Sequence, residues 1–523
     1  MKMNGPWCSG VALVCAAAMA CSSEAGSEAS SNAPDGFDGA EAPANAAPGS
    51  DGDRSSEMAA PGADSNEGTR GASNEGNGID PDLDTSGSNA GSGSGSGDGA
   101  SGASSDGSPA GEPAGPGATP ERPVYDYAAR VEDTGADCAV PALADAAALP
   151  RMDKLPDPFL QLDGTPLGET AQWRCRRQEL LQQAEKYIYG QKPAKPALVS
   201  GSVTRDQVSV DVTEAGTSIH FSAQVVLPPT GTGPFPAIIN LGARDGFGGI
   251  TLGEDFILQQ GVAIIFYNHY DLGQEGQPEA SRGLPNPGLF YDIYGGNHSA
   301  GLLMAWAWGA SRLLDVLQAS GGDIIDPDRV GVTGCSRNGK GAFTVGVFDE
   351  RIALTIPQET STAGLPSYRI VDTLPGAERT NYNFFGLNWL SNDFQPFVEN
   401  APQLPVDSHE MVAMVAPRGL LVLDNPHIAQ FAATAAHTAV LAGAEVYRAL
   451  GFPDNVSYIS DVASDVHCAS GKPEYTQALT QNIAKFLKHE GEAPGTIRPG
   501  PTGTGDLAQW RDWTTPALPT PAD

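Results

Sequence analysis

The stretch from Arg329 to Val345 constrains the fold of this chain more than any other segment. Arg329–Thr333 is predicted to form a short buried strand, and Ala342–Val345 opens a helical pattern. Between them lies Gly334-Cys335-Ser336-Arg337-Asn338-Gly339-Lys340. Small residues on both sides of the serine allow a sharp strand-to-helix turn, which presents the hydroxyl beside the positive end of a helix. The segment therefore predicts a nucleophile elbow.

The turn departs from the strict G-x-S-x-G pattern, because Asn338 occupies the second glycine position and Gly339 follows one residue later. Asn adopts left-handed backbone angles more readily than most residues, so the sharp turn remains possible. The alternative is a glycine-flanked serine in an ordinary turn. The strand before it and the helix after it favour the elbow.

Residues 121–490 have the composition of a folded domain. Ser202–Val212 and Ile219–Leu227 alternate polar and apolar side chains, as paired antiparallel strands do. Pro236–Leu241 and Val262–Phe266 are continuous apolar runs, which indicate strands buried on both faces. Strands then alternate with helical patterns. We therefore expect an α/β fold of the α/β-hydrolase type, a three-layer sandwich with a mostly parallel central sheet and an N-terminal antiparallel hairpin.

The two ends of the chain differ from this domain. Residues 1–21 combine Lys2, a short apolar run and small residues before Cys21, which resembles the signal peptide of a bacterial lipoprotein. Lipidation of Cys21 would anchor the protein in the outer membrane or at the cell surface, and plain secretion is the alternative. Residues 22–120 are rich in Gly, Ser, Ala and Asp, and we expect a disordered linker. Residues 491–523 are rich in Pro and Gly, and we expect a loosely attached tail.

The formal net charge is −33, and acidic residues of the linker contribute strongly to it. So acidic a protein is not expected to bind nucleic acid. No other segment is long and apolar enough to cross a bilayer, so we expect membrane contact only through the N-terminal lipid. We expect the protein to be a monomer.

A serine nucleophile needs a base, and the base needs an acid to orient it. His467 lies shortly before the closing helix, which is where the base lies in this fold. The other histidines of the domain are expected to be packed or surface side chains. Two acids fit the chain order of serine, acid and histidine: Glu359 follows the strand after the elbow helix, and Asp424 follows the strand Leu420–Leu423. Chain order does not choose between them.

Arg337 directly follows the serine. In a site that excludes water, its guanidinium could add a charged donor where negative charge develops on the substrate oxygen. A surface salt bridge is the alternative interpretation.

Four cysteines remain after the leader, namely Cys138, Cys175, Cys335 and Cys468. The last two flank the predicted nucleophile and base, so they must be close if those residues meet. We expect one bridge there and a second between Cys138 and Cys175, which indicates an oxidising compartment. Free buried thiols are the alternative. The even number and the absence of CxxC spacing argue against a metal site.

Six segments share a pattern with one known family: Leu155–Phe159, Trp173–Arg177, Ala305–Arg312, Gly334–Ala342, Ile356–Glu359 and Leu404–His409. They resemble the glucuronoyl esterases of carbohydrate esterase family 15, and the likeness covers most of residues 138–490. It implies an α/β-hydrolase, without a cofactor, that cleaves the ester joining 4-O-methyl-glucuronic acid on xylan to lignin alcohols.

The resemblance also implies roles for individual residues. It matches Ser336 to the nucleophile, His467 to the base, Glu359 to the acid, Arg337 to the oxyanion donor and Lys340 to a lysine that contacts sugar hydroxyls. Some bacterial members resemble this chain in placing an acid at the position of Asp424. Fungal members contain a bridge similar to Cys335–Cys468.

The departures from the family lie among the sugar contacts. The family holds the sugar with a Gln, a Glu and a Trp; the corresponding positions here are Arg379, Leu387 or Asn388, and Gln430 or Phe431. Arg379 could pair with a polar or anionic group. We therefore expect a tethered serine esterase that acts on glucuronate esters of plant cell walls. The alternatives are an esterase for a different acyl or uronate ester, and a non-catalytic carbohydrate-binding surface protein.

Overall fold

The computed structural model describes residues 131–246, 249–276, 285–381 and 388–520. The predicted signal peptide, its Cys21 and the predicted linker lie outside the described residues. All described residues belong to one compact unit, Ala110–Asp523. Among them, no helix has both the length and the apolar character that a membrane span requires.

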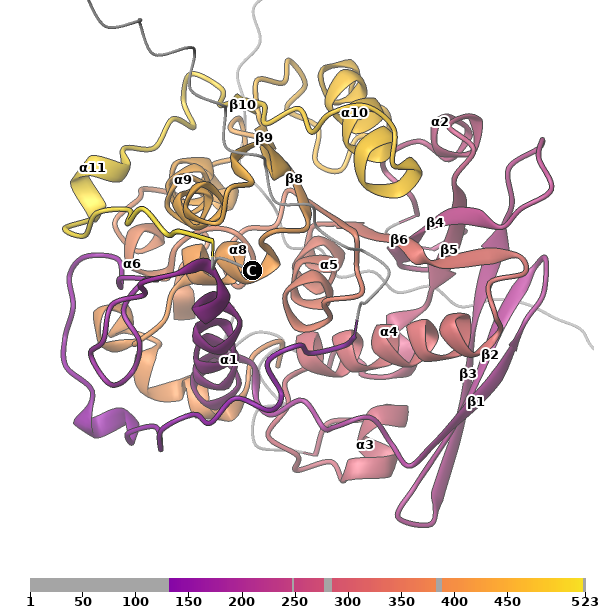
Figure 1. Ribbon diagram of the computed structural model, residues 1–523, viewed down its shortest axis with the longest axis horizontal. Coiled ribbons are helices and arrows are strands. Elements are labelled where there is room, and N and C mark those ends of the chain that lie inside the picture. The colour runs from indigo at the N-terminus through magenta and orange to yellow at the C-terminus, as the bar shows by residue number, and fades with distance from the viewer. Residues whose placement is uncertain (1–130, 247–248, 277–284, 382–387, 521–523) are drawn as a thin grey trace, which may run out of the picture. The chain divides into compact units, whose positions relative to one another are not determined.

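A ten-stranded sheet runs through the described residues in the order β1-β2-β3-β5-β4-β6-β7-β8-β9-β10 (Figure 1). Strands β1 to β3 pair antiparallel, as do β3 and β5, whereas the remaining pairs are parallel. The predicted mostly parallel sheet with an antiparallel N-terminal part is confirmed. The strands are β1 Leu198–Val203, β2 Gln207–Glu214, β3 Thr217–Val226, β4 Phe235–Leu241, β5 Ala263–Tyr267, β6 Ile325–Cys335, β7 Leu354–Gln358, β8 Gly419–Leu423, β9 Val456–Ile459 and β10 Ile497–Arg498.

One predicted strand is divided in two. The alternating run Ser202–Val212 contains the end of β1 and most of β2, which pair with each other across a tight turn. The backbone N–H of Thr204 donates to the carbonyl of Gln207 at 2.8 Å and closes this turn. The polar residues Arg205 and Asp206 stand at its tip, which a period-two pattern alone does not distinguish from a continuing strand.

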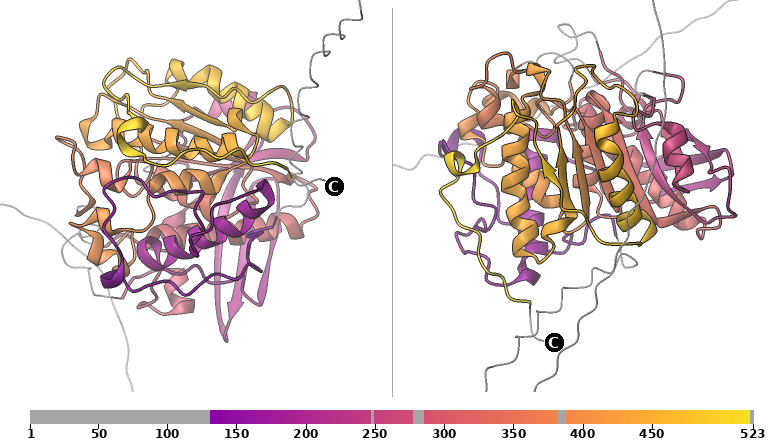
Figure 2. Two further views of the ribbon diagram at one scale, coloured as in Figure 1. Left: turned by 60° about the vertical axis from the view of Figure 1, so that its left-hand side comes forward. Right: turned by 90° about the horizontal axis from the view of Figure 1, so that it is seen from above.

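Helices cover both faces of the sheet and complete the three layers (Figure 2). Neighbouring residues of β4 show the division: Ile238 packs in the cluster beneath α2 and α10, whereas Ile239 packs in the cluster beneath α4, α5, α8 and α9. The α-helices are α1 Trp173–Ala184, α2 Glu254–Gln259, α3 Leu289–Tyr294, α4 Leu302–Ala319, α5 Arg337–Phe348, α6 Tyr368–Val371, α8 Ser408–Val415, α9 Ala433–Ala449, α10 Pro473–Lys488 and α11 Leu507–Trp510.

The C-terminal segment is part of the folded domain, so the prediction of a loosely attached tail is wrong for residues 491–520. Strand β10 extends the sheet beside β9. Trp513 is 8% exposed and donates from Nε1 to the carbonyl of Leu155 at 3.2 Å. Its ring also meets Phe159 edge-on. Pro and Gly in this segment shape an extended path over the domain surface, and the sparse aromatic residues hold it in place.

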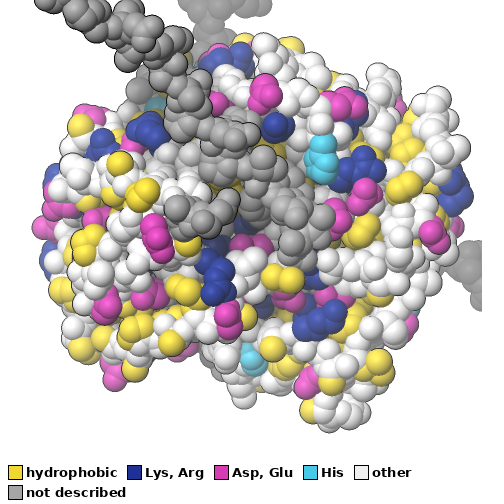
Figure 3. Space-filling model, in the orientation of Figure 1, with side chains coloured by type: hydrophobic (Ala, Val, Ile, Leu, Met, Phe, Trp, Pro, Cys, Tyr) yellow, Lys and Arg dark blue, Asp and Glu magenta, His cyan; other side chains and the backbone are white. Residues whose placement is uncertain are grey.

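Charges of both signs are interspersed on the face drawn in Figure 3, where Lys and Arg side chains lie among Asp and Glu side chains. On this face, the acidic excess of the sequence is not gathered into one patch.

Candidate active site

Ser336 stands between the end of β6 and the start of α5, near the middle of the sheet (Figure 1). Its backbone has φ of 61° and ψ of −128°, a conformation that is uncommon for a residue with a side chain. A Cβ on Gly334 would clash with the carbonyl oxygen of Asn338. A Cβ on Gly339 would lie 2.5 Å from the carbonyl oxygen of Gln358. Both glycines therefore permit the turn, which has the geometry of the predicted elbow.

Gly339, which lies one residue after the second glycine position of the G-x-S-x-G pattern, has a definite structural role. Gly339 is where α5 passes close to the last residue of β7, and that contact leaves no room for a side chain. The backbone N–H of Ser336 also donates to the carbonyl of Gln358 at 3.0 Å. The end of β7 thus lies against the elbow, and the next residue, Glu359, is brought beside the serine's strand.

Glu359 accepts three hydrogen bonds. Its Oε2 accepts from Nδ1 of His467 at 2.7 Å and from the backbone N–H of Cys468 at 2.9 Å. Its Oε1 accepts from Nζ of Lys472 at 2.5 Å. The carboxylate is only 2% exposed. It therefore fixes the imidazole through Nδ1 and leaves Nε2 for contact with a substrate or nucleophile.

Burial raises the pKa of Glu359, but the hydrogen bonds from His467, Lys472 and Cys468 together outweigh burial, and the pKa lies below its usual value. The group is therefore a carboxylate at neutral pH, which is the form that stabilises a protonated imidazole.

The histidine loop is joined to the elbow by a disulfide. Cys335 and Cys468 are bonded, with their Cα atoms 5.9 Å apart, and each directly neighbours one of the two predicted catalytic residues. Within the part of the chain that the structure describes, no hydrogen bond joins the Ser336 hydroxyl to the His467 ring. Hydrogen bonds of this kind commonly tighten only when substrate is bound. The backbone thus brings the two residues together, and their hydrogen bond stays a prediction.

Asp424, the other predicted acid, has different partners. Its Oδ2 accepts from the hydroxyl of Tyr458 at 2.9 Å, and its Oδ1 accepts from the backbone N–H of Asn425 at 2.9 Å. Burial raises the pKa of Asp424 to about 6. Of the two carboxylates, Glu359 is the one that contacts His467.

Two cations occupy the first turn of α5. Nη1 of Arg337 pairs with Oε2 of Glu275 at 2.5 Å, and Nζ of Lys340 pairs with Oε1 of Glu378 at 3.1 Å. The indole ring of Trp389 lies beside both, with the Lys340 ammonium 4.0 Å and the Arg337 guanidinium 5.7 Å from its centre. Burial lowers the pKa of Lys340 to about 8, against the opposing effect of Glu378.

The structure describes most of the positions at which the sugar contacts of the family are replaced. Arg379 is exposed and follows Glu378, whose backbone N–H donates to the carbonyl of Gln430 at 3.0 Å. Phe431 lies against the His467 ring with their centres 4.6 Å apart. Asn388 donates to the side chain of Asn286 at 3.0 Å, and Leu387 lies outside the described residues.

Four side chains form a group that superficially resembles a metal site: Cys335, Glu359, His467 and Cys468. Both sulfurs are joined in the disulfide, so neither is a thiolate that could bind a metal. The histidine and the glutamate are hydrogen-bonded to each other. The arrangement is the one predicted for a base and its orienting acid.

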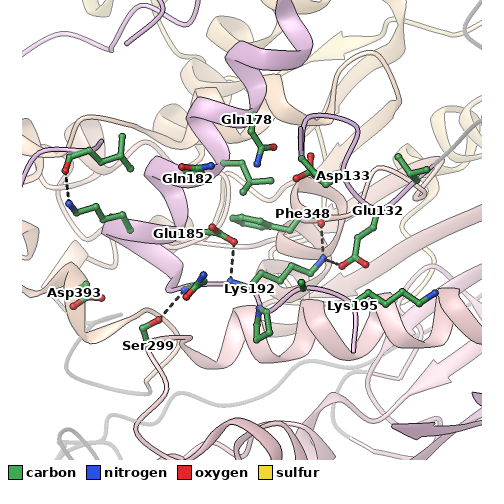
Figure 4. A pocket seen from close by; sticks show the side chains of 18 residues that line it. Glu132, Asp133, Gln178, Gln182, Glu185, Lys192, Lys195, Ser299, Phe348 and Asp393 are labelled. Carbon is green, nitrogen blue, oxygen red and sulfur yellow. Dashed lines mark hydrogen bonds and ion pairs between the residues drawn. The ribbon is translucent and has the colours of Figure 1, made fainter. Parts of the chain in front are cut away.

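A cavity of about 910 Å³ lies elsewhere, beside α1 and the segment after it (Figure 4). Phe348, the last residue of α5, lines it, whereas Ser336 precedes the first residue of the same helix. These ends are about 18 Å apart for a helix of 12 residues. The polar groups of the cavity pair with one another: Lys192 Nζ meets Glu132 at 2.7 Å, and the Lys192 backbone N–H donates to Glu185 at 3.0 Å. The cavity is therefore distinct from the site at the elbow.

Sequence reasoning missed four residues of the site, namely Glu275, Glu378, Trp389 and Lys472. None belongs to a local pattern. Glu275, Glu378 and Trp389 lie in loops and Lys472 directly precedes α10, and only the fold places them beside the elbow. The second predicted disulfide, Cys138–Cys175, is also present and joins the N-terminal segment to α1.

The fold and the site together define a serine hydrolase of the α/β-hydrolase class. Comparison with known proteins narrows this class. The family model described as glucuronyl esterase of fungi matches residues 210–451. The 4-O-methyl-glucuronoyl methylesterase of Hypocrea jecorina is 36% identical over 394 residues, covering 73% of this chain and 80% of that protein. The enzyme of the same name from Podospora anserina is 36% identical over 380 residues, covering 71% and 76%. The chain belongs to the glucuronoyl esterase family.

Solved structures agree with this membership. The catalytic domain of the Hypocrea jecorina glucuronoyl esterase superposes with a TM-score of 0.64 at 33% identity, covering 72% of this chain and all of that domain. A glucuronoyl esterase of carbohydrate esterase family 15, from Caldicellulosiruptor kristjansonii, superposes with a TM-score of 0.58 at 27% identity, covering 71% of this chain and 99% of the other. The predicted family and fold class are confirmed.

Proposed function

We propose that this chain is a carboxylic ester hydrolase that releases 4-O-methyl-glucuronic acid from its esters in plant lignin–carbohydrate complexes. The observation that carries the proposal is the contact of His467 with buried Glu359, fixed by a disulfide beside the serine elbow. Relatives support the substrate: they are named 4-O-methyl-glucuronoyl methylesterases. A glucuronoyl esterase from Sporotrichum thermophile, 34% identical, has been solved with methyl 4-O-methyl-β-D-glucopyranuronate.

The reaction would proceed through an acyl-enzyme. Nε2 of His467 takes the proton of the Ser336 hydroxyl, and Oγ attacks the ester carbonyl. Glu359 holds the Nδ1 proton and stabilises the imidazolium that forms. The protonated ring then gives its proton to the leaving alcohol, and a water molecule activated by the same ring releases the uronic acid.

The negative charge on the carbonyl oxygen needs donors. We assign this role to the backbone N–H of Arg337 at the start of α5 and to its guanidinium. We assign Lys340 to the sugar hydroxyls. Arg379 is proposed to contact a polar or anionic group farther along the substrate, because it is exposed next to Glu378.

An esterase for a different acyl or uronate ester is the second candidate. The altered sugar contacts favour it, because Phe431 lies on the His467 ring and the Lys340 ammonium is already paired with Glu378. Initial rates on benzyl glucuronate, on acetyl esters and on aryl esters separate the two. The proposal expects the highest kcat/KM on the glucuronate. Loss of turnover in Ser336→Ala is required by both candidates, and unchanged turnover in that variant would exclude both.

Export and anchoring are a further part of the proposal. Two disulfides support an oxidising compartment. We propose that residues 1–21 are a lipoprotein signal peptide, that residues 22–120 are a tether and that the catalytic domain follows from about residue 121. Cell fractionation tests the anchor: Cys21→Ala should move the protein from the membrane fraction to the soluble fraction. Wild-type protein found only in the soluble fraction would instead indicate plain secretion.

A further inference from the structure

Glu275, a residue of the loop after β5, uses both oxygens of its carboxylate. Oε2 pairs with Nη1 of Arg337 at 2.5 Å, and Oε1 accepts from the indole Nε1 of Trp389 at 2.7 Å. The Glu275 side chain is 11% exposed, whereas that of Arg337 is 33% exposed. The carboxylate is therefore the fixed member of the pair, and it limits where the guanidinium can lie.

Arg337 is the cation nearest to the proposed nucleophile in the chain, and its charge must serve two different states. The ester substrate is neutral at its carbonyl, and negative charge appears there only in the transition state. The product is a uronate, which carries a full negative charge at the same position. An unopposed guanidinium would therefore stabilise the product as well as the transition state, and product release would suffer.

A carboxylate beside the guanidinium changes this balance. It opposes any anion beside Arg337 through a charge–charge repulsion that acts over several ångströms. The repulsion acts on the full charge of a bound uronate, and it also lessens the stabilisation of the partial charge that develops in the transition state. It leaves the neutral ester almost unaffected. The guanidinium carries five N–H donors, so pairing with one carboxylate is compatible with donation to an oxyanion.

We propose that Glu275 is a positioning residue that orients the Arg337 guanidinium against Trp389 and offsets its charge, so that the site accepts a neutral uronate ester and releases the uronate anion. This role rests on the proposed function. The neighbouring pair of Lys340 and Glu378 has the same composition, which makes the first turn of α5 a row of two cations that each have a carboxylate partner.

The test compares product inhibition with ester binding. Glu275→Gln keeps the size and one accepting oxygen but removes the charge. Inhibition by glucuronic acid should become about tenfold stronger at neutral pH, whereas KM for benzyl glucuronate should change much less. Glu275→Ala removes the anchor of the guanidinium as well as the charge, so its kcat should lie below that of Glu275→Gln.

A matched control lies at the other end of β6. Asp326 pairs with Arg329 at 2.6 Å, and both side chains are about a quarter exposed. Asp326→Asn removes one carboxylate from an Arg pair at a distance from the elbow, so it should leave the inhibition constant for glucuronic acid unchanged. Thermal unfolding of each variant identifies any general loss of stability.

The outcomes distinguish this inference from the function on which it rests. An active wild-type esterase whose inhibition by glucuronic acid is the same in Glu275→Gln would overturn the inference alone. Equal shifts of KM and the inhibition constant would also overturn it, because Glu275 would then affect binding without regard to charge. Wild-type protein that does not hydrolyse glucuronate esters would overturn the proposed function.

Discussion

The replacement Glu359→Gln should show which of the two predicted acids orients His467. The three hydrogen-bond partners of the Glu359 side chain are all donors. His467 and the backbone N–H of Cys468 donate to one oxygen, and Lys472 donates to the other. A glutamine side chain has one accepting end and one donating end. Whichever way it turns, its NH₂ group meets a donor in a buried site.

Both orientations damage the site, in different ways. If the NH₂ group faces Lys472, it meets an ammonium whose side chain is only 2% exposed, and that ammonium is left without its counter-charge. If the NH₂ group faces His467, the ring must accept at Nδ1 and carry its proton on Nε2, so it cannot take a proton from Ser336. A wrong tautomer of this kind lowers kcat by roughly 10⁴-fold in a serine protease. Removing one member of a buried ion pair costs about 3–5 kcal/mol of stability.

The assay is kcat on benzyl glucuronate at neutral pH, with the free energy of unfolding measured in parallel by denaturant titration. Asp424→Asn is the comparison, since Asp424 contacts Tyr458 and Asn425 and not the histidine. We expect Glu359→Gln to lose activity by about the factor above and Asp424→Asn to keep kcat close to that of the wild type. A larger loss of kcat in Asp424→Asn than in Glu359→Gln would show that Asp424, and not Glu359, orients His467.

Three further predictions concern stability. Replacing Cys335 and Cys468 together by Ser opens a loop of 133 residues, and the free energy of unfolding, measured with denaturant, should fall by about 5 kcal/mol in the chain-entropy model. The kcat of this variant should also fall, because the loop that carries His467 loosens. Burial raises the pKa of Glu185 to about 7 in the folded protein, so the folded state loses stability as the pH rises from about 4.5 through 7. Glu185→Gln should therefore be up to about 3 kcal/mol more stable than the wild type at pH 8 and no more stable at pH 4. Denaturant unfolding at the two pH values measures this difference. Trp513→Ala should cost about 3–5 kcal/mol, and a melting temperature equal to that of wild type would contradict the packing of the C-terminal segment.

The elbow and the mostly parallel character of the sheet were predictable because they depend on local patterns. The strand, the small residues and the helix around Ser336 follow one another in the chain, and a buried parallel strand has a recognisable apolar composition. The approach of the His467 loop to the elbow was predictable from its place before the last helix. The disulfide between Cys335 and Cys468 followed from the same placement.

The rest depends on contacts between distant segments. Glu359 and Asp424 both follow strands and both satisfy chain order, and only the path of the loop at His467 decides which carboxylate it meets. Glu275 reaches Arg337 across 62 positions of sequence, and no spacing rule indicates such a pair. The packing of Trp513 against Leu155 spans 358 positions, so composition alone indicated a loose tail.

Ser336 is the proposed nucleophile, and His467 is the base proposed to activate it. Intact-protein and peptide mass spectrometry after treatment with a fluorophosphonate measures this directly, because the reagent bonds to an activated serine. We expect one adduct, on Ser336, that forms rapidly in the wild type and is almost absent in His467→Ala. An adduct on another residue, or equal labelling of Ser336 in the two proteins, would contradict it.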